Sequence, residues 1–216
     1  MSFKAAIWDF DGTLFNTYPG ILKAFERVLE ENGVKGNPEK ILKLMKDYSV
    51  GHAHRYYKEH TPLKDNFMDR YHEYETGLDK RIAQPYPYAR EVCRDIKNSG
   101  GMNFLFTHRD NTAVEYLKLH DMTKYFTEMV TKEKGLKSKP APDPFLYFID
   151  KYHLEKDSVL SVGDRNIEVL SAKAAGVQSC FFKSNDAVLT SEPDYTVNSL
   201  EELYPILGIK PKACNK

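Results

Sequence analysis

Short apolar runs recur along most of the chain. Six of them have the length of a strand, the last being the weakest: Ala5–Trp8, Met102–Phe106, Tyr125–Val130, Ser158–Val162, Val177–Phe182 and Tyr195–Val197. Continuous apolar runs of this kind are typical of parallel strands that are buried on both faces. The runs therefore predict a parallel sheet.

Amphipathic segments separate the later runs, which gives a regular alternation of strand and helix. The predicted helices are Ala89–Asn98, Thr112–His120, Pro144–Tyr152, Glu168–Ala175 and Leu200–Leu207. Strands that alternate with helices imply right-handed crossover connections, with helices on both faces of the sheet. We expect an α/β fold with a doubly wound parallel sheet.

The segment between the first two predicted strands has a different pattern. Apolar residues recur at helical spacing in Ile21–Asn32, and Asn37-Pro38 starts a second helix. Val50–Arg81 predicts two or three more helices, one starting at Pro62 and one ending near Gly77. No run between Asn16 and Ile82 has a strand pattern.

This contrast predicts two domains. We expect a helical domain at residues 16–82, inserted into an α/β core made of residues 1–15 and 83–216. The prolines of Gln84–Pro87 mark the linker between them. The last residues, Lys210–Lys216, are expected to be frayed.

Composition and charge exclude several classes of protein. Of the 216 residues, 41% are hydrophobic, and 31 Lys and Arg balance 31 Asp and Glu, which gives no support for binding to nucleic acid or a membrane surface. No apolar stretch approaches the roughly 18 residues of a membrane span. The first run breaks at Asp9, which does not fit a signal peptide, so we expect a cytoplasmic protein. We also expect a monomer or a homodimer. Cys93, Cys180 and Cys214 are scattered, and we expect the first two to be buried thiols.

The first strand leads directly into two carboxylates. Asp9 and Asp11 lie two positions apart, and Gly12 lets the chain turn away at once. Ligands of open α/β sheets gather at the carboxyl ends of the strands. Two carboxylates so close repel each other unless a positive charge lies beside them, and Mg²⁺ prefers oxygen ligands. The alternative is a strand end and a turn in which Asp and Gly serve the backbone.

The segment Asp9-Phe10-Asp11-Gly12-Thr13 resembles the first motif of the haloacid dehalogenase superfamily, most of whose members are Mg²⁺-dependent phosphatases. Gly163-Asp164, with Glu168 four positions after Asp164, resembles the fourth motif. The resemblance implies that Asp9 is the nucleophile and that Asp11 is the general acid and base. It also implies that Asp9, Asp164 and the backbone carbonyl of Asp11 bind Mg²⁺, with Glu168 in the outer shell. An acid in the first turn of a helix also suits the helix dipole without any metal.

The second and third motifs imply a phosphate site. Thr107 ends the second predicted strand, and its side chain, with the backbone N–H of His108, would bind a phosphate oxygen. Lys139 precedes Pro140-Ala141-Pro142, and the resemblance implies that it neutralises both the nucleophile and the phosphate. Lys137 is the rival by sequence, although the Pro-x-Pro register favours Lys139.

Together the motifs imply a Mg²⁺-dependent phosphatase, similar to phosphoglycolate phosphatases, that hydrolyses a small phosphorylated metabolite through an aspartyl-phosphate on Asp9. The metabolite would be similar to phosphoglycolate or a sugar phosphate. The helical insertion resembles the C1 cap of this superfamily, and Arg55 within it and Arg109 in the core are candidates for substrate specificity.

Three alternatives stay open. A phosphomutase of the β-phosphoglucomutase type would share all four motifs. A 2-haloacid dehalogenase would use the aspartate nucleophile without Mg²⁺, although Asp11 argues against it. A binding or regulatory protein on the same fold is the third, because a fold does not imply a function.

Overall fold

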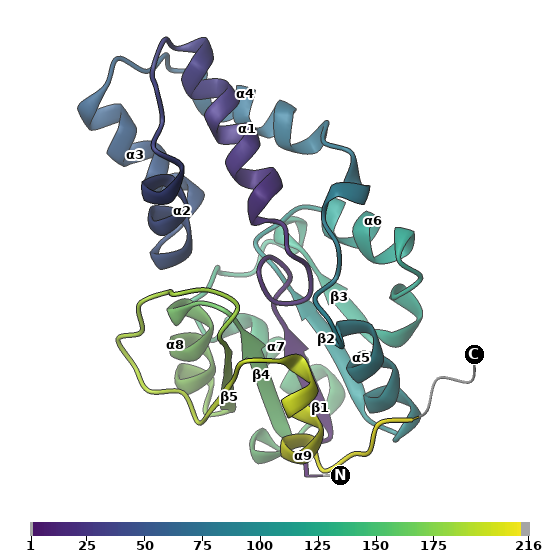
Figure 1. Ribbon diagram of the computed structural model, residues 1–216. Coiled ribbons are helices and arrows are strands. Elements are labelled where there is room, and N and C mark those ends of the chain that lie inside the picture. Colours follow the sequence, from purple (N-terminus) through teal and green to yellow (C-terminus); the bar gives the residue numbers. More distant parts are fainter. Residues whose placement is uncertain (1, 213–216) are drawn as a thin grey trace. The chain divides into compact units, whose positions relative to one another are not determined.

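The structure, a computed structural model, describes residues 2–212 and divides the chain into two compact units (Figure 1). The first, Met1–Phe15 with Pro85–Lys216, contains the sheet and is called here the α/β unit. The second, Asn16–Gln84, is the helical unit, whose residues are all described and include no strand. The second boundary lies at residues 84/85, where the sequence suggested 82/83.

Parallel strands form one sheet in the order β3-β2-β1-β4-β5-β6. They are β1 (Ala5–Trp8), β2 (Met102–Phe106), β3 (Glu128–Val130), β4 (Val159–Gly163), β5 (Gln178–Phe182) and β6 (Tyr195–Val197). The prediction of a parallel sheet is confirmed. β3 is shorter than expected, because Tyr125 belongs to a preceding 3₁₀ turn, η2 (Thr123–Tyr125).

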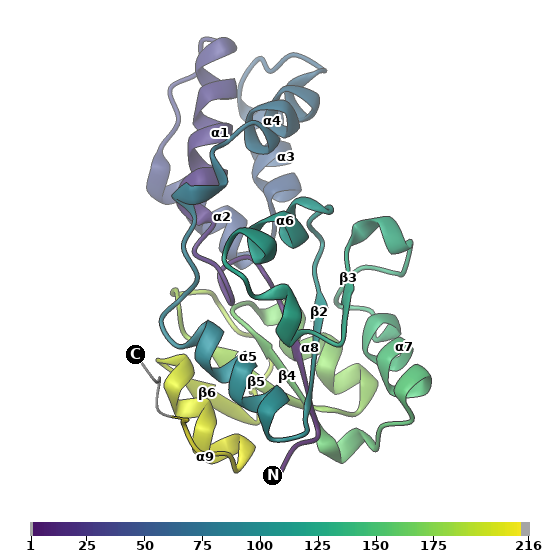
Figure 2. The same ribbon diagram turned by 90° about the vertical axis from the view of Figure 1, so that its right-hand side faces the viewer.

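Helices cover both faces of this sheet. They are α5 (Ala89–Asn98), α6 (Thr112–Leu119), α7 (Asp143–Tyr152), α8 (Asn166–Ala175) and α9 (Leu203–Leu207), with the 3₁₀ turns η3 (Lys132–Lys134), η4 (Lys156–Ser158) and η5 (Leu200–Glu202). Figure 2 shows α5 and α9 on one side of the sheet and α7 and α8 on the other. The doubly wound α/β fold is therefore confirmed.

The predicted last helix is in fact two elements, η5 and α9. Pro205 explains the division, because it has no N–H to bond to a carbonyl one turn earlier. A proline is accepted in the first turn of a helix, and Pro205 is the third residue of α9. The α-helix therefore starts shortly before Pro205, and the residues ahead of it form the separate turn η5.

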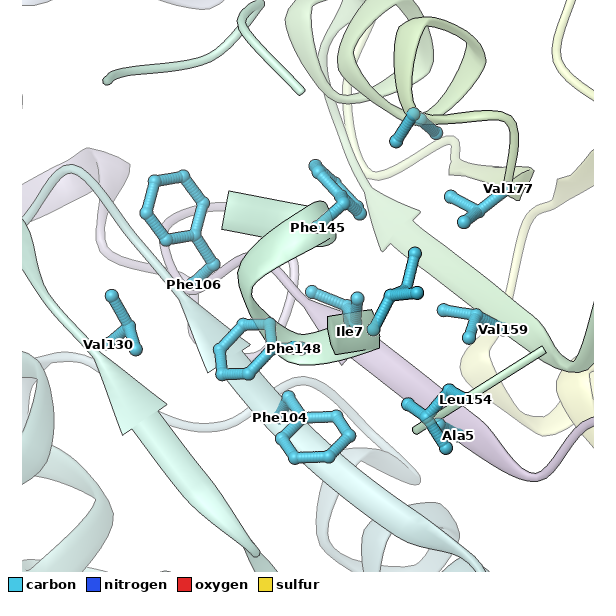
Figure 3. Packing of buried hydrophobic residues seen from close by; sticks show 13 residues of the cluster. Ala5, Ile7, Phe104, Phe106, Val130, Phe145, Phe148, Leu154, Val159 and Val177 are labelled. Atoms are coloured by element: carbon cyan, nitrogen blue, oxygen red, sulfur yellow. The ribbon is translucent and has the colours of Figure 1, made fainter. Parts of the chain in front are cut away.

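Alternate residues of the strands form the two halves of the core. On one face Ile7, Phe104 and Phe106 pack against Phe145 and Phe148 of α7 (Figure 3), and the rings of Phe104 and Phe148 stack at 4.6 Å. Side chains of a strand point alternately to opposite faces, so Trp8 and Asn103 belong to the other face. There the Trp8 indole donates to the Asn103 side chain at 2.9 Å, and Asn103 donates to the backbone carbonyl of Cys93 in α5 at 2.8 Å.

The register of the central strands determines what meets at one edge of the sheet. Trp8 lies opposite Leu105 of β2 and Val162 of β4. The three strands therefore end within about two residues of one another. The residues that follow them, Asp9, Thr107 and Asp164, emerge at the same edge.

The helical unit is built from α1 (Tyr18–Glu31), α2 (Pro38–Asp47), α3 (Val50–His60), α4 (Phe67–Thr76) and a 3₁₀ turn, η1 (Lys80–Ile82). Aromatic side chains form its core: the ring of Phe25 contacts the rings of Tyr57, Phe67 and Tyr71 at 4.9–6.1 Å. This unit therefore has a hydrophobic core of its own.

The helix limits show which sequence signals worked. Asn37 begins α2 as predicted, and its side chain accepts a hydrogen bond from the Lys40 backbone at 3.0 Å. Gly77 ends α4, also as predicted. The prediction of a helix start at Pro62 is wrong, since α4 starts at Phe67, because a proline fits a turn as well as it fits a helix start.

Cys93 and Cys180 are buried, as expected, and burial raises the pKa of both thiols, that of Cys180 to about 12. Cys214 lies outside the described residues. The expectation of a frayed tail is wrong as far as Lys212, whose backbone N–H donates to Asp95 at 3.1 Å, while residues 213–216 lie outside the described range. Among the described residues, each helix is too short or too polar to span a bilayer.

Candidate active site

A buried ion pair lies at the carboxyl edge of the sheet. The Nζ atom of Lys139 is 2.6 Å from Oδ1 of Asp9, and both side chains are at most 3% exposed. Asp9 directly follows β1, and Lys139 lies in the loop between η3 and α7. The two residues are 130 positions apart in the sequence, so only the fold brings them together.

Lys139 bridges two carboxylates. Its Nζ atom is also 2.8 Å from Oε1 of Glu168. Burial opposes the charge of Lys139, but the carboxylates of Asp9 and Glu168 outweigh it and raise the pKa of the ammonium above its ordinary value. Lys137, the rival by sequence, is 80% exposed and lies 3.7 Å from Asp143 instead. Of the two lysines, the structure brings Lys139 to Asp9.

Three acidic side chains approach one another closely. One carboxylate oxygen each of Asp9, Asp164 and Glu168 lies within 4.8 Å of the others, and all three residues are buried. Oδ2 of Asp9 is buried and has no hydrogen-bond partner among the described residues. Burial raises the pKa of Asp9 to about 6, an effect that Lys139 partly offsets. An unsatisfied carboxylate oxygen in an all-oxygen cluster fits a hard divalent cation such as Mg²⁺.

Glu168 is held between β4 and α8. It is the third residue of α8, and its Oε2 atom accepts a hydrogen bond from the backbone N–H of Arg165 at 3.1 Å. Its side chain lies over Gly163, where an added Cβ would be only 2.2 Å from Cγ of Glu168. Burial opposes its ionisation, but Lys139 and Arg165 lower the pKa of Glu168 overall. Glu168 therefore serves the helix terminus and the ion pair at once.

Asp11 does not belong to this acidic cluster, and its side chain pairs with a guanidinium group. Nε of Arg109 lies 3.0 Å and 3.2 Å from the two oxygens of Asp11, and Nη2 lies 2.8 Å from Oδ1. The Arg109 side chain is 7% exposed, and its guanidinium lies 5.8 Å from the rings of Phe10 and Tyr116. Arg109 therefore fixes the orientation of the Asp11 side chain.

Thr107 and His108 support the site in two ways. Thr107 is buried, and its hydroxyl accepts a hydrogen bond from the backbone N–H of Arg109 at 3.0 Å. The His108 ring accepts a hydrogen bond at Nε2 from the backbone N–H of Lys139 at 3.0 Å. Burial, with Lys139 and Arg165 nearby, lowers the pKa of His108 to about 3, so the ring is neutral and can accept. His108 thus contacts the loop that carries the buried lysine.

Sequence reasoning missed two contacts of Asp164. The hydroxyl of Thr13 donates to its Oδ1 at 3.1 Å, and the amide of Asn185 donates to its Oδ2 at 2.7 Å. Asn185 lies three residues beyond the end of β5. The strand-end rule that selected Asp9, Thr107 and Asp164 takes the residue directly after each strand, which for β5 is Lys183, so it does not reach Asn185.

Arg55 is the one candidate residue that belongs to the helical unit. It lies on α3 and is exposed. The remaining candidates all lie in the α/β unit, and the contacts above join them into one site.

The chain matches known proteins over most of its length. The family model described as haloacid dehalogenase-like hydrolase matches residues 6–182. A pyrophosphatase PpaX from Halalkalibacterium halodurans is 24% identical, over 98% of this chain and 100% of its own. A phosphoglycolate phosphatase from Neisseria meningitidis is 26% identical, over 93% of this chain and 92% of its own. A crystal structure titled as that of a predicted phosphoglycolate phosphatase from Haemophilus somnus has a TM-score of 0.83 and 21% identity, and the match covers 95% of this chain and 98% of that one.

Proposed function

Because the chain belongs to the haloacid dehalogenase-like hydrolase family, we propose that it is a Mg²⁺-dependent phosphatase that acts on a small phosphorylated metabolite through an aspartyl-phosphate on Asp9. The observation that carries this proposal is the environment of Asp9. One of its oxygens is bonded to the buried Lys139, and the other is unsatisfied among the described residues, beside Asp164. A carboxylate held in this way is oriented by a cation and still has an oxygen for further chemistry.

The proposed reaction has two steps. In the first, a carboxylate oxygen of Asp9 attacks phosphorus, the bond to the leaving oxygen breaks, and Asp11 gives that oxygen a proton. In the second, water attacks the phosphorus of the aspartyl-phosphate and loses a proton to Asp11, which releases inorganic phosphate and restores Asp9. The same carboxyl group therefore serves as acid and then as base.

The other site residues stabilise charge in this proposal. Lys139 offsets the negative charge of Asp9 and of the transferring phosphoryl group, and Thr107 and the backbone N–H of His108 bind phosphate oxygens. Asp9, Asp164 and the backbone carbonyl of Asp11 would hold Mg²⁺, with Glu168 acting through water. When bound, the ion would supply further positive charge at the phosphoryl oxygens.

The substrate class is proposed from the relatives. The names of the two relatives described above specify a pyrophosphatase and a phosphoglycolate phosphatase. We therefore propose a small substrate such as phosphoglycolate, a sugar phosphate or pyrophosphate. The helical unit is the cap domain in this proposal, and Arg55 and Arg109 are its candidates for substrate discrimination.

The test is phosphate release from an aryl phosphate and from a panel of these metabolites, with Mg²⁺ and with EDTA. We expect metal-dependent release, and in Asp9→Asn a loss of about 10⁴-fold or more, the scale expected when an enzyme nucleophile is removed. Repeating the panel with Arg55→Ala and Arg109→Ala would show which arginine changes the ranking of substrates.

A matched pair of lysine variants sharpens the test. Lys139→Ala should lose most of the activity, whereas Lys137→Ala, two positions away and exposed, should keep it. Full activity in Asp9→Asn or with EDTA would contradict the proposal. Isomer formation in place of phosphate release would identify a phosphomutase, and light scattering would distinguish a monomer from a homodimer.

A further inference from the structure

The loop that follows β5 contacts the candidate metal site. Its second and third residues are Ser184 and Asn185. The Ser184 hydroxyl donates to the backbone carbonyl of Gly12 at 2.6 Å, and the Asn185 amide donates to Oδ2 of Asp164 at 2.7 Å. The loop therefore contacts both Asp164 and the turn that carries Asp11.

The orientation of the Asn185 amide is determined by its second contact. Its Oδ1 atom accepts a hydrogen bond from the backbone N–H of Ala187 at 2.8 Å. Because the carbonyl oxygen is used there, the NH₂ group is the part that faces the Asp164 carboxylate. Asn185 is 8% exposed, so neither contact competes freely with water.

The loop itself is attached to α8. The side chain of Asn166 donates to the hydroxyl of Thr190 at 2.9 Å and accepts from the Thr190 backbone N–H at 2.8 Å. Asn166 is the first residue of α8 and lies two positions after Asp164. Both ends of the segment from Ser184 to Thr190 are therefore bonded to residues at or beside the candidate site.

A neutral donor has a different effect on a carboxylate than a cation has. Lys139 is a cation paired with Asp9, whereas the hydroxyl of Thr13 and the amide of Asn185 are neutral groups that donate to Asp164 and orient it. Two hydrogen bonds to one carboxylate restrict the rotation of the side chain. Partners of metal ligands commonly set metal affinity in this way.

We propose that Asn185 is a positioning residue that holds Asp164 ready for a divalent cation and thereby sets the affinity of the site for Mg²⁺. The inference rests on the proposed function, because it assumes that Asp164 binds the ion. It adds a residue outside the four sequence motifs.

The experiment measures Mg²⁺ binding to the full chain by isothermal titration calorimetry, without substrate. Asn185→Ala removes both contacts. Asn185→Ser removes the amide that donates to Asp164 but keeps a shorter side chain whose oxygen can accept from the backbone N–H of Ala187. We expect Mg²⁺ affinity to fall by about 10- to 100-fold in both variants, the usual effect of losing a partner of a metal ligand.

The matched control is Ser191→Ala, in the same loop, which removes only a hydroxyl that accepts from Lys173 at 2.8 Å. This variant should bind Mg²⁺ as the wild type does. Thermal melting without metal shows whether each variant is folded, and the Mg²⁺-induced rise in melting temperature gives a second measure of affinity.

Each outcome has a clear meaning. Wild-type affinity in both Asn185 variants, or an equal loss in Ser191→Ala, would overturn the inference and leave the proposed function standing. Mg²⁺ binding that survives Asp164→Asn, or no Mg²⁺ binding by the wild type, would overturn the proposed metal site itself. Weaker binding in the two Asn185 variants alone would support the inference.

Discussion

At the scale of single residues, the His108 ring is the unexpected feature of the site. Sequence reasoning gave His108 a role through its backbone N–H, whereas the structure shows its ring bonded to the backbone N–H of Lys139. Because burial, with Lys139 and Arg165 nearby, lowers the pKa of His108 to about 3, the ring is neutral at pH 7 and can accept this bond. His108 is therefore a positioning residue for the loop of Lys139.

This role predicts different effects of two substitutions. His108→Phe leaves the Lys139 N–H without an acceptor, at a cost of about 1–3 kcal/mol, and we expect phosphatase activity to fall by about 5- to 100-fold. His108→Gln places an oxygen near the position of Nε2 and should recover most of the activity. Steady-state kinetics of both variants, with melting temperatures as the control for folding, measures this.

The pH profile gives a second readout for His108. Near pH 6.5, the ordinary pKa of histidine, the activity of the wild type and that of His108→Gln should change with pH in the same way. Equal activities of the Phe and Gln variants would show that the hydrogen bond accepted from the Lys139 backbone does not contribute to activity, which would contradict the positioning role.

At the scale of elements, the junction of β4 and α8 depends on Gly163. Its missing Cβ leaves the space that Glu168 fills, and an added Cβ would be 2.2 Å from Cγ of Glu168 and 2.6 Å from its Cβ. Glu168 cannot move aside freely, because it is buried and bonded to Lys139 and to the Arg165 backbone. The close approach requires glycine here for space.

Gly163→Ala should therefore destabilise the protein by about 1–3 kcal/mol, the usual cost of overpacking a core, and should lower activity through Glu168 and Lys139. The control is Gly51→Ala in α3, where an added Cβ would lie 3.8 Å from the Ser49 hydroxyl, an ordinary van der Waals contact. That change should be neutral or stabilising by up to about 1 kcal/mol. Urea unfolding of both variants compares them, and equal stability would contradict the argument.

At the scale of the whole α/β unit, Asp95 joins parts that are distant in the sequence. This buried side chain of α5 accepts hydrogen bonds from the hydroxyl of Tyr204 in α9 at 2.9 Å and from the backbone N–H of Lys212 at 3.1 Å. It also pairs with Arg94 at 2.8 Å. Burial alone would raise the pKa of Asp95, but Arg94, Lys212 and Tyr204 outweigh it and hold the pKa below its ordinary value.

The lowered pKa has a consequence for acid stability. A carboxyl with a lower pKa in the folded state stabilises the protein above its unfolded pKa of about 3.9, and this stabilisation is lost as the pH falls through the folded value. Asp95→Asn should therefore cost about 1–3 kcal/mol at pH 7, and the difference from the wild type should shrink below about pH 4.

Urea unfolding at a series of pH values checks this prediction. Tyr204→Phe is the control, because it removes one hydrogen bond, worth about 1 kcal/mol, and leaves the carboxyl in place. A difference between Asp95→Asn and the wild type that does not change with pH would show that the charge of Asp95 does not contribute.

The sequence by itself determined the architecture of the α/β unit and the positions of its main chemical groups. Apolar runs such as Ala5–Trp8 have the length and composition of buried strands, and the period of the later intervening segments is helical, so a doubly wound parallel sheet could be inferred, although its strand order could not. Motif residues at strand ends, such as Asp9 and Asp164, could be selected because the edge of a parallel sheet gathers them. The start of α2 could be predicted from Asn37 before Pro38, because a helix cap depends only on residues within one turn.

Only the tertiary structure decided which groups are partners. The Pro-x-Pro register favoured Lys139 over Lys137, but only the fold shows that the Nζ atom of Lys139 lies 2.6 Å from Oδ1 of Asp9. The contacts of Asn185 with Asp164 and of the His108 ring with Lys139 join segments 21 and 31 residues apart, and no local pattern encodes them. The physical reason is that propensity and periodicity act over a few residues, whereas the partner of a buried polar group is whichever chain segment the packed core brings within about 3 Å.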